Sequence, residues 1–182
     1  VTTARLLGNT TLIRRDEQLE ETALSSLELH LYQITPHIQR QLVQTPLALG
    51  LILEISTCLG LFGGTEKLVA EAADILRNTH HQFVMALGHT AAAAWLLTKT
   101  SSPSLLEPSR EEITRQLKEL PVDVLDLAEH RDQLQKMGFA TLGDIAAQIN
   151  ATRVDSLRKR LGHEFSVYLS DLFDIEGDFA QR

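Results

Sequence analysis

The 182-residue chain contains a single cysteine and no long hydrophobic run. Cys58 cannot form an internal disulfide on its own, which fits a protein of the reducing cytoplasm. The longest apolar stretch, residues 47–55, is interrupted by Glu54 and is far shorter than the ~20 residues that span a bilayer. The N-terminus also lacks a basic-then-apolar signal segment. We therefore expect a cytoplasmic protein without membrane contact and, since the chain begins at Val1 in mid-pattern, a cloned fragment.

The chain likewise lacks a positive net charge. Its 24 acidic and 17 basic residues give a formal net charge of −7. Affinity for nucleic acid comes largely from Lys and Arg side chains that neutralise phosphates, so this sign predicts weak autonomous binding to DNA. Any contact with DNA must therefore use a local basic patch. The length and the 43% of hydrophobic residues are ordinary for one globular domain or two small ones.

The first hundred residues alternate between strand and helix patterns. Strands are predicted over residues 10–14, 37–43, 47–56 and 82–87. Helices are predicted after Asp16 as an N-cap, after the turn at Gly63 and Gly64, and from Thr90. This order is the ferredoxin-like arrangement, in which two helices cover one face of an antiparallel sheet. We therefore predict an α+β subdomain over residues 1–100.

The second half of the chain, residues 101–182, has the pattern of short helices joined by tight turns. Ser109 with Glu112 predicts a capping box for a helix that ends before Pro121. The further predicted helices cover residues 129–137, 142–148, 153–161 and 164–173. Gly138 and Gly162 stand where helix-ending glycines are preferred. The pattern predicts a small all-helical subdomain with helix-hairpin-helix motifs.

Several other residues that often carry chemistry are predicted to have structural roles. His80 and His81 are adjacent, but a metal site needs three or four converging ligands, and the other histidines have no motif spacing. The glycine-rich residues 60–64 lack the P-loop lysine and predict a turn into a helix. Trp95, on an alanine-rich helix, is expected to anchor that helix against the sheet. No metal site and no cofactor are predicted.

Five short stretches are similar, in order and spacing, to the Y-family DNA polymerases. They are residues 53–55 (LEI), 61–64 (LFGG), 86–91 (ALGHTA), 120–122 (LPV) and 134–145 (LQKMGFATLGDI). The first two resemble the end of the family's palm hairpin, the third its Gly-Ile-Ala-x-Asn-Lys segment, and the last two its thumb. The resemblance implies a palm-like subdomain over residues 1–100, with its first strand missing, followed by a helix-hairpin-helix thumb over residues 101–182.

The chain departs from the family at the catalytic carboxylates. Two-metal nucleotidyl transfer needs several carboxylates that converge on Mg²⁺. By the resemblance, the Asp-Glu pair of the palm hairpin falls on Leu49 and Gly50, and neither residue can bind a metal ion. No acidic residue lies between Glu28 and Glu54, so no shift of the alignment within the hairpin restores the pair. We therefore expect no polymerase activity from this chain.

The phosphate-binding features of the family are also altered. The Asn-Lys pair that handles the incoming nucleotide falls on Thr90 and Ala91, which removes a cation. The Gly-Ile-Gly of the first thumb hairpin is replaced by residues 125–129 (LDLAE), where Asp126 and Glu129 are expected to repel a phosphate.

With these departures, and with residues 52–58 (ILEISTC) followed by 61–64 (LFGG), the chain resembles the ImuB group of Y-family relatives with a degraded active site. The resemblance implies a non-catalytic protein that docks on DNA and recruits partners in damage-induced, error-prone translesion synthesis. Its implied partners are DNA, the replication sliding clamp, a RecA-like accessory protein and a separate error-prone polymerase of the replicative type. The strand with the first catalytic aspartate is expected before Val1, and the clamp-binding tail beyond Arg182.

The resemblance also indicates a DNA-binding turn in the thumb. Its residues are Arg158, Lys159, Arg160, Leu161, Gly162 and His163. In this hypothesis the backbone of the turn holds a phosphate, with the three cations and a helix N-terminus beside it. The alternative is a solvated charged face with a routine glycine cap. Two other functions stay open: an active polymerase with relocated ligands, such as Glu54, and a protein-interaction module that no longer touches DNA.

Overall fold

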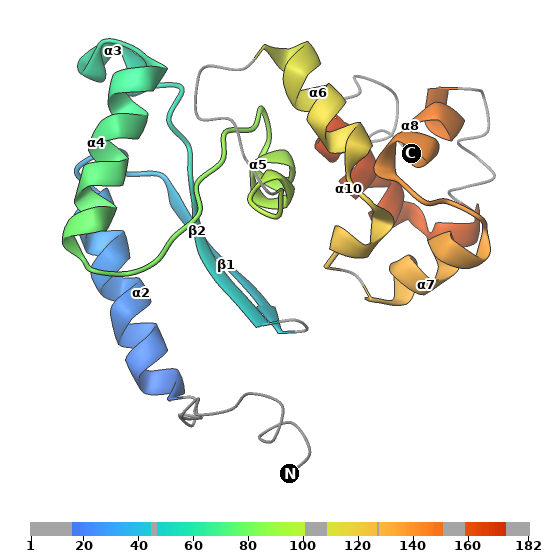
Figure 1. Cartoon of the computed structure of the whole chain (residues 1–182), viewed down its shortest axis with the longest axis horizontal. Coiled ribbons are helices and arrows are strands. Elements are labelled where there is room, and N and C mark those ends of the chain that lie inside the picture. Colours follow the sequence, from blue (N-terminus) through green and yellow to red (C-terminus); the bar gives the residue numbers. More distant parts are fainter. Residues whose placement is uncertain (1–15, 45–46, 101–108, 127, 151–158, 174–182) are drawn as a thin grey trace, which may run out of the picture.

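The computed structural model describes residues 16–44, 47–100, 109–126, 128–150 and 159–173, and Figure 1 shows their arrangement. The described part is a mixed α/β structure in which helices dominate and one two-stranded antiparallel hairpin is present. Within it, no helix combines the length and the apolar character that crossing a membrane requires. The predicted strand at residues 10–14 lies outside the described residues.

The first described helix, α2 (Glu17–Leu31), begins where the sequence predicts it. Asp16 caps it, because the carboxylate Oδ1 accepts the backbone N–H groups of Gln18 at 3.0 Å and Leu19 at 3.1 Å. Leu24 and Leu31 are buried, so one face of α2 packs inward and the cap fixes where that face begins.

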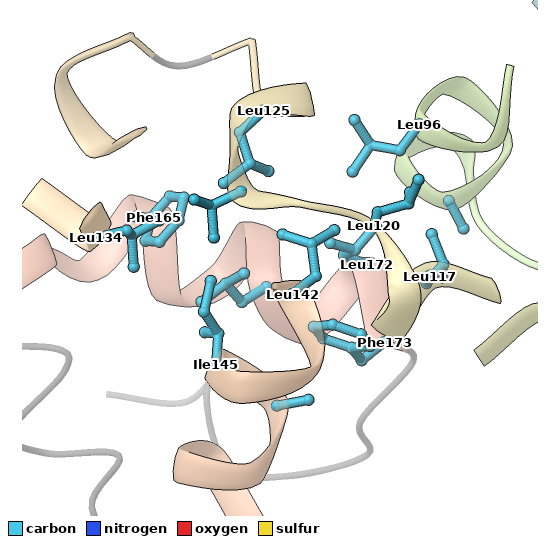
Figure 2. Packing of buried hydrophobic residues seen from close by; sticks show 14 of the residues in the cluster. Leu96, Leu117, Leu120, Leu125, Leu134, Leu142, Ile145, Phe165, Leu172 and Phe173 are labelled. Atoms are coloured by element: carbon cyan, nitrogen blue, oxygen red, sulfur yellow. The ribbon is translucent and has the colours of Figure 1, made fainter. Parts of the chain in front are cut away.

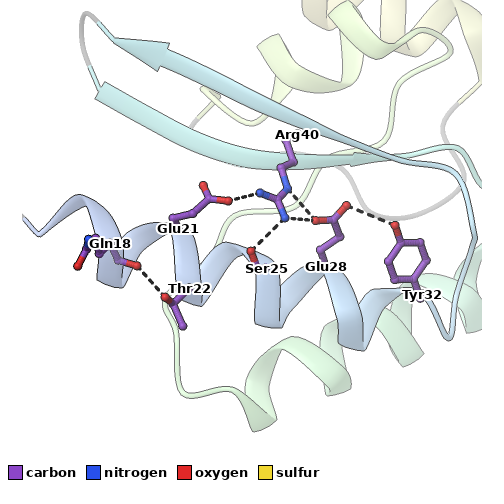
Figure 3. Close-up of polar contacts among 7 residues, drawn as sticks. All are labelled: Gln18, Glu21, Thr22, Ser25, Glu28, Tyr32 and Arg40. Carbon is purple, nitrogen blue, oxygen red and sulfur yellow. Dashed lines mark hydrogen bonds and ion pairs between the residues drawn. The ribbon is translucent and has the colours of Figure 1, made fainter.

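The antiparallel hairpin consists of β1 (Ile38–Gln44) and β2 (Leu47–Leu53), with Ile38 opposite Leu53. Arg40 of β1 ties the hairpin to α2, as Figure 3 shows. Its Nε donates to Glu28 at 2.7 Å, its Nη2 donates to Ser25 at 3.1 Å, and it forms an ion pair with Glu21. These contacts set the position of α2 relative to the hairpin.

A tight turn then leads into the helix that packs beside α2. The short α3 (Leu59–Phe62) ends at Gly63, and α4 (Thr65–Asn78) begins after Gly64. The φ angles of the two glycines are +74° and +116°, which only glycine adopts readily. Leu31, Ile34, Cys58, Leu68 and Ala72 form the buried centre of this half. The predicted turn into a helix is confirmed, and the thiol of Cys58 is free and buried.

In the described residues one strand prediction is wrong and another extends three residues too far. Residues 82–87 form no strand, because no described backbone edge pairs with them. The strand β2 ends at Leu53 instead of Ser56, since the Glu54 carboxylate accepts the Ser56 N–H at 2.8 Å and turns the chain. The described sheet is therefore a hairpin and not the four strands of a ferredoxin-like fold.

The helix α5 (Ala91–Leu97) connects this half with the helical half. Thr90 caps it by accepting the Ala93 N–H at 3.1 Å. Its buried residues Ala93, Leu96 and Leu97 belong to the core of the helical half, whereas Trp95 reaches the hairpin. The second core therefore begins before residue 100.

The helical half surrounds one hydrophobic core, shown in Figure 2. Its elements are α6 (Arg110–Glu119), the 3-10 turn η1 (Val122–Val124), α7 (Ala128–Lys136), α8 (Leu142–Asn150) and α10 (His163–Phe173). Gly138, with φ of +85°, ends the turn after α7, and Thr141 accepts the Asp144 N–H at 3.2 Å near the start of α8. Of the predicted helix at 153–161, only 159–161 are described, and these are helical.

The cap of α6 is half of the predicted capping box. Ser109 Oγ accepts the Glu112 N–H at 3.2 Å. The Glu112 carboxylate is instead occupied within the helix, where it accepts from Arg115 at 2.6 and 3.0 Å and from Gln116 at 2.9 Å. Its hydrogen bonds from Arg115 and then Gln116 lower the pKa of Glu112 to about 2.

Replacing Arg115 by alanine is expected to return the pKa of Glu112 toward its ordinary value of ~4.3. A carboxyl whose pKa is lowered in the folded state adds stability above its unfolded pKa, and this stability is lost as the pH falls toward 2. A ¹³C NMR titration of the side-chain carboxyls measures the shift. Glu111 is the control, because its pKa is lowered by its own backbone and by Ser109. An unchanged Glu112 titration in the variant would contradict the assignment.

Candidate nucleic-acid interface

The two hairpin positions where the sequence resemblance predicts that catalytic carboxylates are missing, Leu49 and Gly50, lie on β2. Leu49 is aliphatic and 38% exposed. Gly50 faces the ring of Trp95, so closely that a Cβ atom built on Gly50 would lie 2.5 Å from Cζ3 of the indole. Real Cβ atoms essentially never approach a carbon atom that closely. The space that a side chain at position 50 would need is therefore filled by Trp95.

Trp95 is held in this place by polar contacts with the helical half. Its Nε1–H donates to Asp126 Oδ2 at 2.5 Å. Asp126 also forms an ion pair with Lys99, and the Lys99 ammonium group donates to the Val124 carbonyl at 2.7 Å. The predicted role of Trp95 as an anchor against the sheet is confirmed. Asp126 is engaged by an indole and an ammonium group, so its charge is balanced inside the protein.

Glu54, the acid nearest to these positions, organises the turn that follows β2. Its carboxylate accepts from the Ser56 N–H and hydroxyl and from the Thr57 hydroxyl at 3.4 Å. The hydrogen bond from the Ser56 hydroxyl is the main cause that lowers the pKa of Glu54. In the part of the chain that the structure describes, no three His, Cys, Asp or Glu side chains are grouped as a metal site requires.

The predicted DNA-binding turn joins two helices in the helical half. Arg158 lies outside the described residues. Lys159 and Arg160 are exposed at the end of a helix, whereas the side chain of Leu161 is buried. Gly162 has φ of +87°, which lets the chain reverse within one residue, and α10 begins directly at His163. The structure therefore brings two cations, a glycine turn and a helix N-terminus together.

The turn is fixed to α7 by His130, which no sequence motif indicates. The imidazole of His130 stacks on Phe165 with ring centroids 4.4 Å apart and an interplanar angle of 15°. Its Nε2 lies 3.1 Å from the Leu161 carbonyl and must donate there, since a carbonyl oxygen only accepts. No local pattern could have indicated this contact, because His130 and Leu161 are 31 residues apart.

The first N–H groups of α10 give the turn its capacity to bind an anion. The N–H groups in the first turn of a helix have no intrahelical acceptor and carry a partial positive charge. The backbone hydrogen bonds of α10 begin at Ser166, whose N–H donates to the Gly162 carbonyl at 3.4 Å. Lys159 and Arg160 precede these N–H groups in the chain, and the negative charge of the exposed Glu164 weakens the positive potential at the turn. The arrangement suits weak binding of a phosphate group.

Comparison with known proteins adds no further assignment: no family model, no curated protein and no solved structure matches the chain.

Proposed function

We propose that this chain is a non-catalytic Y-family polymerase homologue of the ImuB type. In this role it docks on DNA and recruits partners during damage-induced, error-prone translesion synthesis. The observation that carries the proposal is the contact of Trp95 with Gly50, because an aromatic ring occupies the hairpin position where the family has an acid. A polymerase active site cannot share that space.

The proposed architecture is a ferredoxin-like palm over residues 1–100 and a helix-hairpin-helix thumb over residues 101–182. The order of α2, β1, β2 and α4 supports the palm, because a hairpin between two helices is the centre of a ferredoxin-like unit. The tight turn at Gly162 supports the thumb, because it joins two helices through one residue.

DNA binding is assigned to the turn formed by Arg158, Lys159, Arg160, Leu161, Gly162 and His163. Its two described cations are exposed, and its backbone is held by the buried Leu161. The net charge of −7 repels the DNA phosphates at long range, so the proposed binding is weak and depends strongly on salt concentration. The proposed protein partners are the sliding clamp, a RecA-like accessory protein and an error-prone polymerase. Only the sequence resemblance supports them.

The acidic net charge favours a second candidate function. A protein-interaction module that no longer touches DNA would keep the fold and lose the need for cations. Glu54 gives less support to an active polymerase with relocated ligands, because its carboxylate is engaged by Ser56 and Thr57.

The experiment that separates these functions replaces Lys159 and Arg160 together by alanine. On a primer-template duplex in low salt, fluorescence anisotropy is expected to show weaker binding and a slope of log K against log salt reduced by about 2, since each phosphate contact contributes about 1. The matched control replaces Lys67 and Arg77 of α4, which removes the same charge at a distance from the turn. Equal binding curves for the two variants would leave the interaction module as the better function.

A further inference from the structure

The imidazole of His89 has both of its nitrogen atoms buried without a hydrogen-bond partner. Neither Nδ1 nor Nε2 touches solvent, and neither bonds to another atom among the described residues. Buried polar groups are normally hydrogen-bonded, because the loss of their hydration is otherwise uncompensated. His89 lies between α4 and α5, directly before Thr90, the N-cap of α5. It is therefore an unpaired polar group at the start of the helix that connects the two halves.

The residues on both sides of His89 are fixed to the first turn of α5. A Cβ atom built on Gly88 would overlap the backbone nitrogen of Ala94, so the chain before His89 packs directly on the helix. On the other side, the Thr90 hydroxyl accepts the Ala93 N–H at 3.1 Å, and the Thr90 carbonyl accepts the Ala94 N–H at 3.0 Å. A change in how the imidazole packs therefore acts on this turn.

The surroundings of His89 favour its neutral form. Burial is the largest cause that lowers the pKa of His89, because an imidazolium loses its hydration there. The helix α5 packs against α6 and α10, and each of these brings one charge to the imidazole. Arg110 of α6 lowers the pKa of His89 further, whereas Asp171 of α10 raises it. In the described part of the chain these are the two charged side chains that act on the ring.

We propose that His89 is a pH-sensitive switch that releases the first turn of α5 from the helical half in acid. A neutral imidazole stays packed and keeps the turn closed. A protonated imidazole is better hydrated when the turn is open, so acid favours the open state. The same helix carries Trp95, which contacts the hairpin and donates to Asp126. Opening would therefore loosen the connection between the two halves. This inference does not rest on the proposed function.

The direction of the pH effect follows from the lowered pKa of His89. Well above the ordinary value of ~6.5, the imidazole is neutral in both the closed and the open state, and pH has no effect. Below that value the open state takes up a proton that the closed state does not, so the closed state loses stability as the pH falls. The limit between pH 7.5 and pH 5 is a change of about thirtyfold in the opening equilibrium.

The test is amide hydrogen exchange measured by NMR at pH 7.5 and pH 5, corrected for the intrinsic pH dependence of exchange. The protection of the Ala93 and Ala94 amides is expected to fall in acid by up to about thirtyfold. The Leu68 amide of α4, which donates to the Gly64 carbonyl, should keep its protection. His89→Phe keeps a ring without a titrating group and should abolish the loss.

His81→Gln is the matched control, because it removes an exposed imidazole from the same connecting segment. It should leave the loss of protection unchanged. An equal loss in His89→Phe, or an equal loss at Leu68, would overturn the proposal, since acid would then act elsewhere or on the whole fold.

A second measurement needs no variant. An NMR titration of the His89 imidazole in the unaltered chain is expected to show a midpoint below the ~6.5 of an ordinary histidine. A midpoint at or above that value would contradict the switch. So would Ala93 and Ala94 amides whose protection at pH 5 stays within twofold of that at pH 7.5.

Discussion

Replacing Gly50 by aspartate is expected to lower the free energy of unfolding by about 3 kcal/mol and to produce no polymerase activity. The new Cβ would lie 2.5 Å from Trp95 Cζ3, so the indole must move. Overpacking of this kind costs roughly 1–3 kcal/mol, and a carboxylate placed against an aromatic ring adds a desolvation cost. Urea unfolding measures the stability, and primer extension with Mg²⁺ or Mn²⁺ measures the activity.

Gly60→Asp is the matched control, because a Cβ at Gly60 meets no atom within 4 Å. It introduces the same charge with little change in stability. The double variant Gly50→Asp/Trp95→Ala tests the cause, since removing the ring should make the two changes strongly non-additive. Equal stability of the two aspartate variants would contradict the steric argument. Templated extension that Glu54→Ala abolishes would overturn the non-catalytic function.

Phe165→Ala is expected to destabilise the helical half by about 3–5 kcal/mol, the usual cost of removing a buried phenyl ring. Phe165 is 2% exposed and stacks on both His130 and Tyr168. For a chain of this length the melting temperature should fall by about 10 °C. The variant should also loosen the turn for which we propose DNA binding, because Phe165 stacks on the imidazole that donates to the Leu161 carbonyl.

Val167→Ala provides the comparison on the same helix, since Val167 is 40% exposed and its removal leaves no cavity. Phe165→Leu keeps most of the volume and loses the stacking, so it should fall between the two. Differential scanning calorimetry measures all three. A melting temperature for Phe165→Ala within one or two degrees of Val167→Ala, on the scale of ~2–4 °C per kcal/mol, would contradict the role of this ring in the core.

Local signals in the sequence predicted most boundaries of the described elements. The sequence predicts Asp16 and Ser109 as N-caps, and each accepts a backbone N–H at the start of its helix. Thr90, predicted as the first residue of its helix, is the N-cap of α5. Gly138 and Gly162 were predicted as helix ends, and both have positive φ angles. These features depend on a few neighbouring residues, so short patterns determine them.

Features that depend on distant partners could not be predicted in the same way. Residues 82–87 have the composition of a strand, but a strand also needs an adjacent edge. The burial of α5 in the helical core depends on α6 and α10, which lie beyond residue 100, the predicted end of the first subdomain. The bond between Trp95 and Asp126 spans 31 residues. Nothing in the alanine-rich pattern of α5 indicated which partner the indole would take.

The candidate site shows the same division. Lys159, Arg160, Gly162 and His163 are contiguous, so their proximity followed from the sequence alone. The contact between Gly50 and Trp95 did not, because it joins a strand to a helix 45 positions later in the chain. Only the folded structure explains why position 50 is a glycine.

The contact between Gly50 and Trp95 also limits how this sequence can change over evolutionary time. A larger residue at position 50 destabilises the protein as long as Trp95 is present, and losing Trp95 first removes the partly buried ring that packs on the hairpin. Asp126 would then lose the indole that donates to it. In either order, the first of the two mutations lowers the stability of the protein. The two residues are therefore hard to replace one at a time.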